Sequence, residues 1–338
     1  MVCPWYSRSL PKYEGRTGSW AASPTPGPIS DDPTRRAGLW VRIGDMTNLH
    51  VHEWGTDATP KAIVQIAHGM AEHGGRYDGL AKFLADKGFG VIAADHRGHG
   101  QSYGDDKLLG YFAPQNGWDI VVEDLHGVRR SAEHRFPGLP YFMIGHSMGS
   151  MLLRDYLSRW GVGLAGAAIV GTGLWPGASG EIGLALAKAL ARFKPRDQGK
   201  LLNSLAFAGY NSGFEGRTDK DWLTRDEQIV DDYIGDHYAG YVPTNQFFVD
   251  LFSGLKRVNS DDIARRTPSK LPLYITSGSA DPVGGEKAVR TIAEQYRRFG
   301  LVNVTEKVWP EARHEIFNET NRAEVYADLF DWMEGVLA

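Results

Sequence analysis

The sequence predicts an α/β fold, with a mostly parallel central sheet flanked by helices and a helical cap inserted between sheet strands. Short apolar runs typical of buried strands alternate with segments of helical period over much of the chain, which favours a parallel sheet covered on both faces. Residues 171–261 break this alternation with two apolar helical patterns. A serine between two glycines stands between an apolar run at residues 141–144 and a helical run at residues 150–157, as at a sharp strand-to-helix turn.

A proline-rich segment precedes the predicted sheet. Residues 1–36 hold six of the 17 prolines and show neither a helical nor a strand period, so we expect a flexible leader there. The first part of the core should cover residues 37–170. In it we expect strands at residues 39–43, 49–54, 62–67, 90–94, 141–144 and 165–170, and helices at residues 77–87 and 118–135.

The helical cap is predicted over residues 171–261. Its first apolar pattern includes Leu186, and its second includes Phe247, Phe248 and Leu251; we expect these side chains to wall a substrate pocket. The alternative is that they pack on each other and on the sheet, since an apolar helix face usually belongs to a core. The core resumes over residues 262–338, with strands at residues 271–277 and 304–309 and helices at residues 285–299 and near the carboxyl terminus.

The sequence Gly-His-Ser-Met-Gly at residues 145–149 is the strongest chemical signal. Small residues on both sides of Ser147 let the backbone turn sharply and let neighbouring segments approach. The helix that follows directs its positive end at the serine, where it would stabilise a developing oxyanion. Ser147 is therefore the candidate nucleophile, and its hydroxyl needs a base together with a group that orients the base.

An acid and a base follow Ser147 in chain order. Asp281 lies in a polar turn after the predicted strand at residues 271–277, and His314 lies in the loop after the strand at residues 304–309. Both positions are at the carboxyl ends of strands, where sites form in open α/β sheets. We therefore expect Ser147, Asp281 and His314 to form a catalytic triad.

An oxyanion hole needs two backbone N–H donors. One should come from Met148, the residue after the nucleophile, and the other from a loop after an early strand. The loop after residues 62–67 begins His-Gly-Met, so Met70 is the second expected donor.

Three motifs together resemble one branch of a known enzyme family. They are His-Gly-Met-Ala-Glu-His at residues 68–73, Asp-His-Arg-Gly-His-Gly-Gln-Ser at residues 95–102 and Gly-His-Ser-Met-Gly at residues 145–149. They resemble the monoacylglycerol lipase and lysophospholipase branch of the α/β-hydrolases, which is also grouped with the S33-like serine aminopeptidases. The resemblance covers residues 38–338 and implies an α/β-hydrolase fold and a Ser–Asp–His carboxylic-ester hydrolase that needs no cofactor. Met70 departs from the small residue or phenylalanine that relatives often carry, and this affects the shape of the pocket.

The resemblance and the apolar cap predict a serine esterase that acts on single-chain lipid esters, such as monoacylglycerols or lysophospholipids, through an acyl-enzyme. A serine aminopeptidase or a thioesterase would use the same triad. An aminopeptidase would also need a carboxylate to hold the substrate ammonium, and the acidic run near Glu227 offers one. A non-catalytic binding protein on the same fold is a further alternative, which the intact triad disfavours.

Charge and composition bear on partners and location. A formal net charge of −4 over 338 residues gives no reason to expect nucleic acid as a partner. The single cysteine, Cys3, suits a reducing compartment, and the sequence shows no signal-peptide pattern, so we expect a cytoplasmic protein. The expected partner is a small-molecule lipid ester, with transient contact between the cap and a membrane surface.

Two further groups of side chains have competing interpretations. His50 and His52 lie on one face of a predicted strand, but no second ligand pair has the spacing of a metal site. We therefore expect surface histidines and no metal. Asp95 and Arg97 are expected to fix their loop as a charge-assisted pair.

Overall fold

The computed structural model describes residues 35–43, 47–55, 59–103 and 108–338. The predicted leader, residues 1–36, lies outside the described residues except for its last two, which open the first strand. Within the described ranges, no helix has the length and apolar character that a membrane crossing needs.

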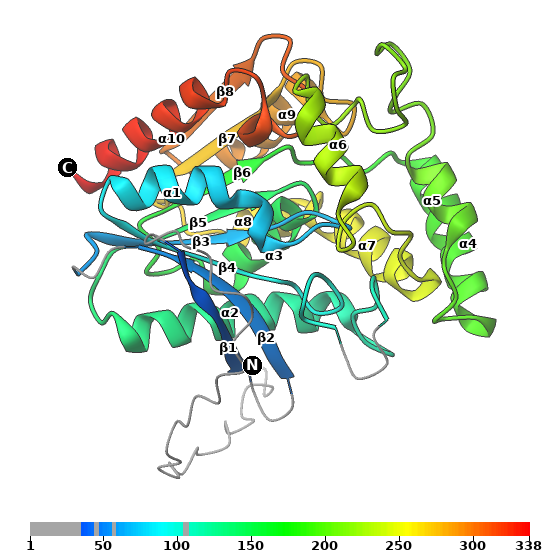
Figure 1. Ribbon diagram of the computed structural model, residues 1–338, viewed down its shortest axis with the longest axis horizontal. Helices are drawn as coiled ribbons and strands as arrows, with labels where there is room; N and C mark the ends of the chain where they lie inside the picture. Colours follow the sequence, from blue (N-terminus) through cyan, green and yellow to red (C-terminus); the bar gives the residue numbers. More distant parts are fainter. Residues whose placement is uncertain (1–34, 44–46, 56–58, 104–107) are drawn as a thin grey trace, which may run out of the picture.

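A twisted sheet forms the centre of the molecule (Figure 1). In the described part of the chain it has eight strands, in the order β1-β2-β4-β3-β5-β6-β7-β8. The first two pairs, β1 with β2 and β2 with β4, are antiparallel, and all later pairs are parallel. The strands are β1 (Arg35–Ile43), β2 (Thr47–Trp54), β3 (Ala62–Ala67), β4 (Phe89–Ala94), β5 (Tyr141–His146), β6 (Gly166–Val170), β7 (Leu273–Gly278) and β8 (Val304–Trp309).

Helices cover both faces of this sheet, as parallel strands require, because each crossover must pass over a face. One face packs on α1 (Asp78–Asp86) and α10 (Arg322–Leu337) through a core that includes Leu84 and Leu329. The opposite face packs on helices that contribute Val121, Leu152 and Ile292, and Figure 1 shows the longest of them below the sheet. These helices are α2 (Gly117–Arg135), α3 (Met148–Trp160), α8 (Asp261–Arg266) and α9 (Gly285–Arg298).

Five helices lie between β6 and β7 in the chain, and the first four of them gather beyond one end of the sheet (Figure 1). These four are α4 (Ala178–Phe193), α5 (Lys200–Ala206), α6 (Glu227–Gly235) and α7 (Asn245–Val258). We call residues 171–261 the cap. The acidic run near Glu227 begins α6, where the Asp226 side chain accepts hydrogen bonds from the N–H groups of Gln228 and Ile229. Acidic residues favour a helix N-terminus because they complement its unpaired N–H groups and its dipole.

The strand order reverses at β3. From β3 the chain passes to β4 on one side and then returns to β5 on the other side. The loops that leave β3 and β5 must therefore diverge, and they leave a crevice at the carboxyl ends of these strands. Two short 3₁₀ helices, η1 (Gly74–Tyr77) and η2 (Ile316–Asn318), belong to loops at this end.

Candidate active site

Ser147 occupies a sharp turn between β5 and α3. Its backbone has φ 52° and ψ −122°, a conformation that costs a non-glycine residue on the order of 1–3 kcal/mol and persists only where the surroundings enforce it. The Ser147 N–H donates to the carbonyl of Val170 on the neighbouring strand at 2.9 Å. The turn is thus held from β6, and the serine is presented at the end of the sheet.

The two glycines of this turn are required by close approach. A Cβ at Gly145 would lie 2.5 Å from the carbonyl oxygen of Gly149, and a Cβ at Gly149 would overlap the carbonyl oxygen of Ala67 on β3. Larger residues at either position would push α3 away from the sheet. These contacts confirm the expectation that the two glycines let neighbouring segments approach the turn closely.

Asp281 and His314 meet across the loops after β7 and β8. The Nδ1 atom of His314 lies 2.9 Å from Oδ1 of Asp281, and both side chains are buried. Asp281 also accepts a hydrogen bond from the Val283 N–H at 2.9 Å and from the Ser277 hydroxyl at 2.6 Å. Ser277 was missed in the sequence, where it is simply the last residue of a predicted strand.

The environment of Asp281 favours its charged form. Burial by itself raises the pKa of this carboxyl, but the charge and hydrogen bond of His314, with the donors Ser277 and Val283, outweigh burial and lower the pKa below its ordinary value. A carboxylate in this position fixes the orientation of the imidazole and leaves Nε2 as the acceptor of a proton.

A buried carboxylate holds the loop after β3. Glu72 accepts hydrogen bonds from the Gly69 N–H at 2.5 Å and from the Tyr77 hydroxyl at 2.9 Å. Arg76 donates to the same carboxylate at 2.6 Å and makes a two-pronged contact with Glu315 at 2.7 and 2.8 Å. This network fixes the loop that contains Met70 and ties it to the residue after His314.

His146 completes the network. Its Nδ1 lies 3.5 Å from Glu72, and its Nε2 lies 3.2 Å from the His314 carbonyl oxygen. Burial lowers the pKa of His146, but the hydrogen bond and charge of Glu72, with the charge of Glu315, outweigh it and raise the pKa. Burial also works against the charge of Glu72, but His146 and Arg76 hold its pKa well below the ordinary value.

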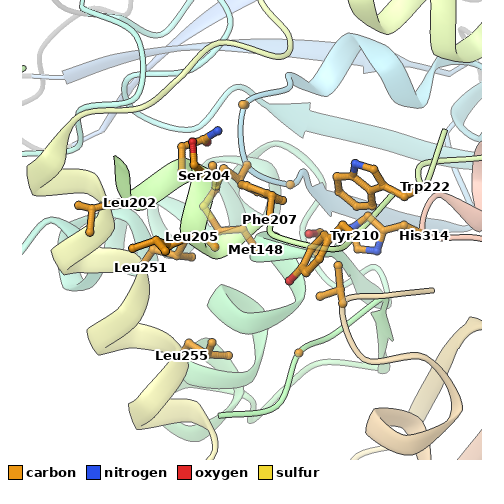
Figure 2. A pocket seen from close by; sticks show the side chains of 18 of the residues that line it. Met148, Leu202, Ser204, Leu205, Phe207, Tyr210, Trp222, Leu251, Leu255 and His314 are labelled. Atoms are coloured by element: carbon orange, nitrogen blue, oxygen red, sulfur yellow. The ribbon is translucent and has the colours of Figure 1, made fainter. Parts of the chain in front are cut away.

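A cavity of about 1030 Å³ opens over these residues. It is lined by Ser147 and His314, by both predicted oxyanion donors, and by the cap. Figure 2 shows Met148 and His314 together with cap side chains such as Leu251. The predicted pocket residues Leu186 and Leu251 line it as well. The predicted residues that line this one cavity are Ser147, His314, Met70, Met148, Leu186 and Leu251. Asp281 lies behind His314 and is hydrogen-bonded to it.

The prediction that Phe247 and Phe248 line the pocket is wrong. Both side chains are fully buried, and neither is among the residues that line the cavity. Phe247 packs on Phe112 with ring centroids 4.8 Å apart, and Phe248 packs on Phe252. One helical face of α7 thus fills the core, and the adjacent positions Leu251 and Leu255 face the cavity. A helical period locates the apolar stripe, but it does not say which edge of the stripe borders a void.

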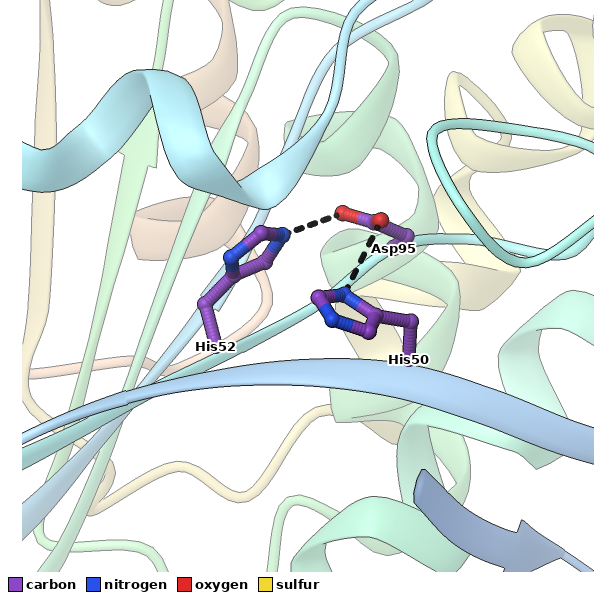
Figure 3. A group of neighbouring side chains, drawn as sticks. All are labelled: His50, His52 and Asp95. Atoms are coloured by element: carbon purple, nitrogen blue, oxygen red, sulfur yellow. Dashed lines mark hydrogen bonds and ion pairs between the residues drawn. The ribbon is translucent and has the colours of Figure 1, made fainter. Parts of the chain in front are cut away.

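The histidines of β2 also differ from their prediction. His50 and His52 are buried rather than on the surface, and they flank Asp95, with His52 Nε2 3.0 Å from Oδ1 and His50 Nδ1 3.4 Å from Oδ2 (Figure 3). Asp95 also accepts the N–H groups of Gly74 and Gln101. Among the described residues, His50, His52 and Asp95 form the one group of histidines and carboxylates whose ligand atoms lie close enough together to hold a metal ion.

The donor set at Asp95 nevertheless fits a hydrogen-bonding centre better than a metal site. Each carboxylate oxygen accepts one backbone N–H and faces one imidazole nitrogen. The carboxylate thereby joins β2 to the loops after β3 and β4. The expected pair of Asp95 with Arg97 is also wrong, because Arg97 binds the Asp124 carboxylate of α2 at 2.9 and 3.0 Å.

The acidic run around Glu227, residues 219–236, brings only its first carboxylate to the cavity. Asp219, its first acidic residue, lines the cavity, whereas Asp226, Glu227, Asp231 and Asp232 do not. Of these, Asp226 pairs with Arg322 and Asp231 with Arg217. The carboxylates that do line the cavity are Glu72 and Glu315, which bind Arg76, and Asp219, which binds Lys220. A free carboxylate for a substrate ammonium is therefore not offered by the predicted run.

Comparison with known proteins agrees with this geometry. The family described as serine aminopeptidase, S33 matches residues 58–321. A monoacylglycerol lipase of Mycolicibacterium smegmatis is 29% identical over 83% of this chain and 90% of its own length. The human monoglyceride lipase is 28% identical over 81% of this chain and 85% of its own length.

A solved structure is similar over nearly the same extent. The thermostable carboxyl esterase of Bacillus coagulans, in complex with glycerol, has a TM-score of 0.81 and 29% identity, covering 89% of this chain and 98% of the esterase. The family match at residues 58–321 includes strands β3 to β8. It also includes the strained turn at Ser147 and the contact between Asp281 and His314. This chain belongs to the serine aminopeptidase S33 family and is built on the α/β-hydrolase fold.

Proposed function

We propose that this chain hydrolyses esters of single-chain lipids, monoacylglycerols or lysophospholipids, through an acyl-enzyme on Ser147. The coarser part of this function rests on its relatives: the chain is a serine hydrolase that cleaves carboxylic esters. The observation that carries the finer part is the cavity, in which a strained serine and a carboxylate-bound histidine meet an apolar cap.

In the proposed mechanism Ser147, Asp281 and His314 act as a triad. Nε2 of His314 takes the Ser147 proton while the serine oxygen attacks the ester carbonyl carbon. The backbone N–H groups of Met70 and Met148 hold the oxyanion. His314 then gives the proton to the departing alcohol, and water frees the acid by the same steps in reverse. No cofactor or metal takes part.

The division of labour in this proposal follows the chain. Residues 37–170 and 262–338 form the core that carries the chemistry, and residues 171–261 form the cap that binds the substrate. The apolar cap residues Leu186, Leu251 and Leu255 line the cavity, and Asn203, Ser204 and Asn211 line it as well. An acyl chain would lie along the first group, and a hydroxylated or phosphorylated head group would lie along the second. A single-chain lipid ester has both parts.

The cap also offers a surface for contact with lipid aggregates. Four large apolar side chains of α4 and α5 are more than half exposed, and two of them, Ile182 and Leu205, also line the cavity. The four are Ile182, Phe193, Leu201 and Leu205. Such a patch fits transient binding to a membrane surface, from which a lipid would enter. The single cysteine in the sequence suits a cytoplasmic site of action.

An aminopeptidase or thioesterase activity with the same triad is less favoured. The acidic run that an aminopeptidase would use brings only the carboxylate of Asp219 to the cavity, and this carboxylate is paired with Lys220. The relatives and the solved structure named for comparison are also lipases and an esterase by their names. Rates on an amino-acid anilide and on an acyl thioester, measured beside an acyl ester, separate the three activities.

The test is the variant Ser147→Ala, compared with the unchanged chain on a panel of glycerol, phosphoglycerol and alkyl esters of graded acyl length. We expect loss of all measurable hydrolysis and of labelling by a fluorophosphonate probe, with an unchanged circular dichroism spectrum. Hydrolysis that persists in Ser147→Ala contradicts the mechanism. Preference for the shortest alkyl esters over every lipid ester contradicts the substrate class.

A further inference from the structure

A segment of the cap runs directly beside the loop that carries His314. The His314 N–H donates to the Trp222 carbonyl at 3.4 Å, and the Glu315 N–H donates to the Leu223 carbonyl at 2.7 Å. In return, the Arg313 guanidinium donates to the carbonyls of Asp221 at 2.6 Å and Thr224 at 3.3 Å. The backbone on both sides of Trp222 is thus bound to the residues on both sides of His314.

The Trp222 side chain covers one side of the His314 imidazole. Their ring centroids are 5.1 Å apart with planes 39° apart, and Figure 2 shows the indole beside the imidazole at the edge of the cavity. Phe207 and Tyr210 pack on the indole with centroid distances of 5.8 and 5.2 Å. The backbone N–H of Trp222 donates to the Asn211 side-chain oxygen at 3.0 Å. The indole is therefore held in place by the cap itself.

We propose that Trp222 is a positioning residue for the acyl-transfer reaction: its indole holds the His314 ring and stabilises the positive charge that the ring gains when it takes the Ser147 proton. This inference rests on the proposed function, because it needs His314 as the base. Aromatic faces attract a cation within about 6 Å of the ring centroid, and tryptophan does so best. The charge on His314 exists in the transition state and not in the resting enzyme, so its stabilisation raises kcat.

Apart from Asp281, the described charged and titratable groups around His314 are not placed to stabilise a positive charge on its ring. Asp281 faces Nδ1. His146 lies on another side with ring centroids 4.7 Å apart, and a protonated His146 would oppose a second positive charge. Glu72 and Glu315 are bound to Arg76. From the cap, the Tyr210 phenol is neutral near pH 7, because burial and the charge of Asp281 raise its pKa to about 12.

The expected effect follows from the strength of a cation–aromatic contact. Trp222→Leu should lower kcat by about 2- to 30-fold, with a smaller change in KM. Trp222→Phe keeps an aromatic face and should recover part of the loss. The matched control is Trp175→Leu. Trp175 lines the same cavity, but its ring packs against Gly180 and lies under the Lys256 ammonium. Trp175→Leu should act mainly on KM.

The pH profile separates this role from simple shielding. Loss of the indole face disfavours the protonated imidazole, so the acid limb of kcat/KM in Trp222→Leu should move to lower pH. If Trp222 only excluded water, its removal would admit water, favour the protonated imidazole and move that limb to higher pH. Trp175→Leu should leave the limb in place.

The outcomes distinguish this inference from the function on which it rests. If Ser147→Ala is inactive while Trp222→Leu keeps kcat within twofold and an unmoved acid limb, the inference alone is overturned. A shift of the limb to higher pH overturns it as well. If Ser147→Ala stays active, the proposed function fails first. Trp222→Phe, which preserves most of the packing, gives the answer where Trp222→Leu does not fold.

Discussion

Replacing Glu72 with glutamine tests whether a buried hydrogen-bond network holds the loop after β3, which contains the proposed oxyanion donor Met70. Glu72 is 3% exposed and receives hydrogen bonds from Gly69, Tyr77 and Arg76. In Glu72→Gln the amide oxygen keeps the bonds from Gly69 and Tyr77. The amide nitrogen then faces the Arg76 guanidinium, donor against donor.

The size of the effect follows from what remains paired. The variant loses its charge-assisted bond to Arg76 and its attraction to His146, and hydrogen bonds to charged groups contribute about 1.5–3 kcal/mol each. Arg76 keeps its two-pronged contact with Glu315, so no guanidinium is left unpaired. We expect a loss of about 2–4 kcal/mol in the free energy of unfolding. A chain of ordinary stability would survive this loss folded.

The effect on catalysis should exceed what instability explains. If the amide repels Arg76, the Gly69–Met70 segment shifts, and loss of one oxyanion donor costs on the order of 10²-fold in kcat. Urea unfolding gives the stability term, and hydrolysis of a short acyl ester well below the melting temperature gives kcat. Glu286→Gln is the control, because Glu286 binds Arg290 in a largely exposed pair on α9. The reasoning is refuted if Glu72→Gln matches Glu286→Gln in both measurements.

Three further predictions follow from single side chains. Asp281→Asn should lower kcat on the order of 10⁴-fold, because an amide no longer fixes the productive tautomer of His314; a loss under tenfold would show that Asp281 is not the orienting acid. Burial raises the pKa of Asp250 to about 7, although hydrogen bonds from Gln246, Gly117 and Trp118 act in the opposite direction. The folded chain therefore binds this proton more tightly than the unfolded chain does. The free energy of unfolding consequently falls as pH rises from about 4 to about 7. Asp250→Asn should accordingly raise the Tm more at pH 8 than at pH 5, and equal shifts at both would contradict the assignment. Phe247→Ala should cost about 3–5 kcal/mol of stability with unchanged acyl-length preference, whereas Leu251→Ala should change that preference; the reverse result would return Phe247 to the pocket wall.

Local patterns in the sequence were enough to predict the sheet, and they placed each of the three proposed triad residues in the turn or loop that follows a strand. The strand at residues 62–67 coincides with β3, because a short apolar run between polar turns has few other ways to bury itself. The glycines around Ser147 indicated a tight turn, and the structure shows the close contacts that require them. Asp281 and His314 were picked out by their places after strands, and the fold joins them by a hydrogen bond.

Contacts between distant segments were beyond local pattern. His50 and His52 alternate along β2 as surface residues would, yet the loops after β3 and β4 close over them and supply Asp95 as their partner. Arg97 stands two residues from Asp95 but binds Asp124, because in the folded chain α2 lies within reach. Ion pairs form with whichever charge the fold brings within reach, and sequence distance says little about that.

What the sequence by itself determined is therefore the kind of chemistry: a serine on a sharp turn, an acid and a histidine after later strands, and the parallel sheet that gathers strand ends at one edge. Only the tertiary structure decided which apolar side chains border a void and which fill the core, and which charges meet. It alone placed Trp222, some 90 residues before His314 in the chain, against the imidazole. The physical reason is that strand and helix periods are local properties of the backbone, whereas cavities and buried polar networks arise from how whole elements pack.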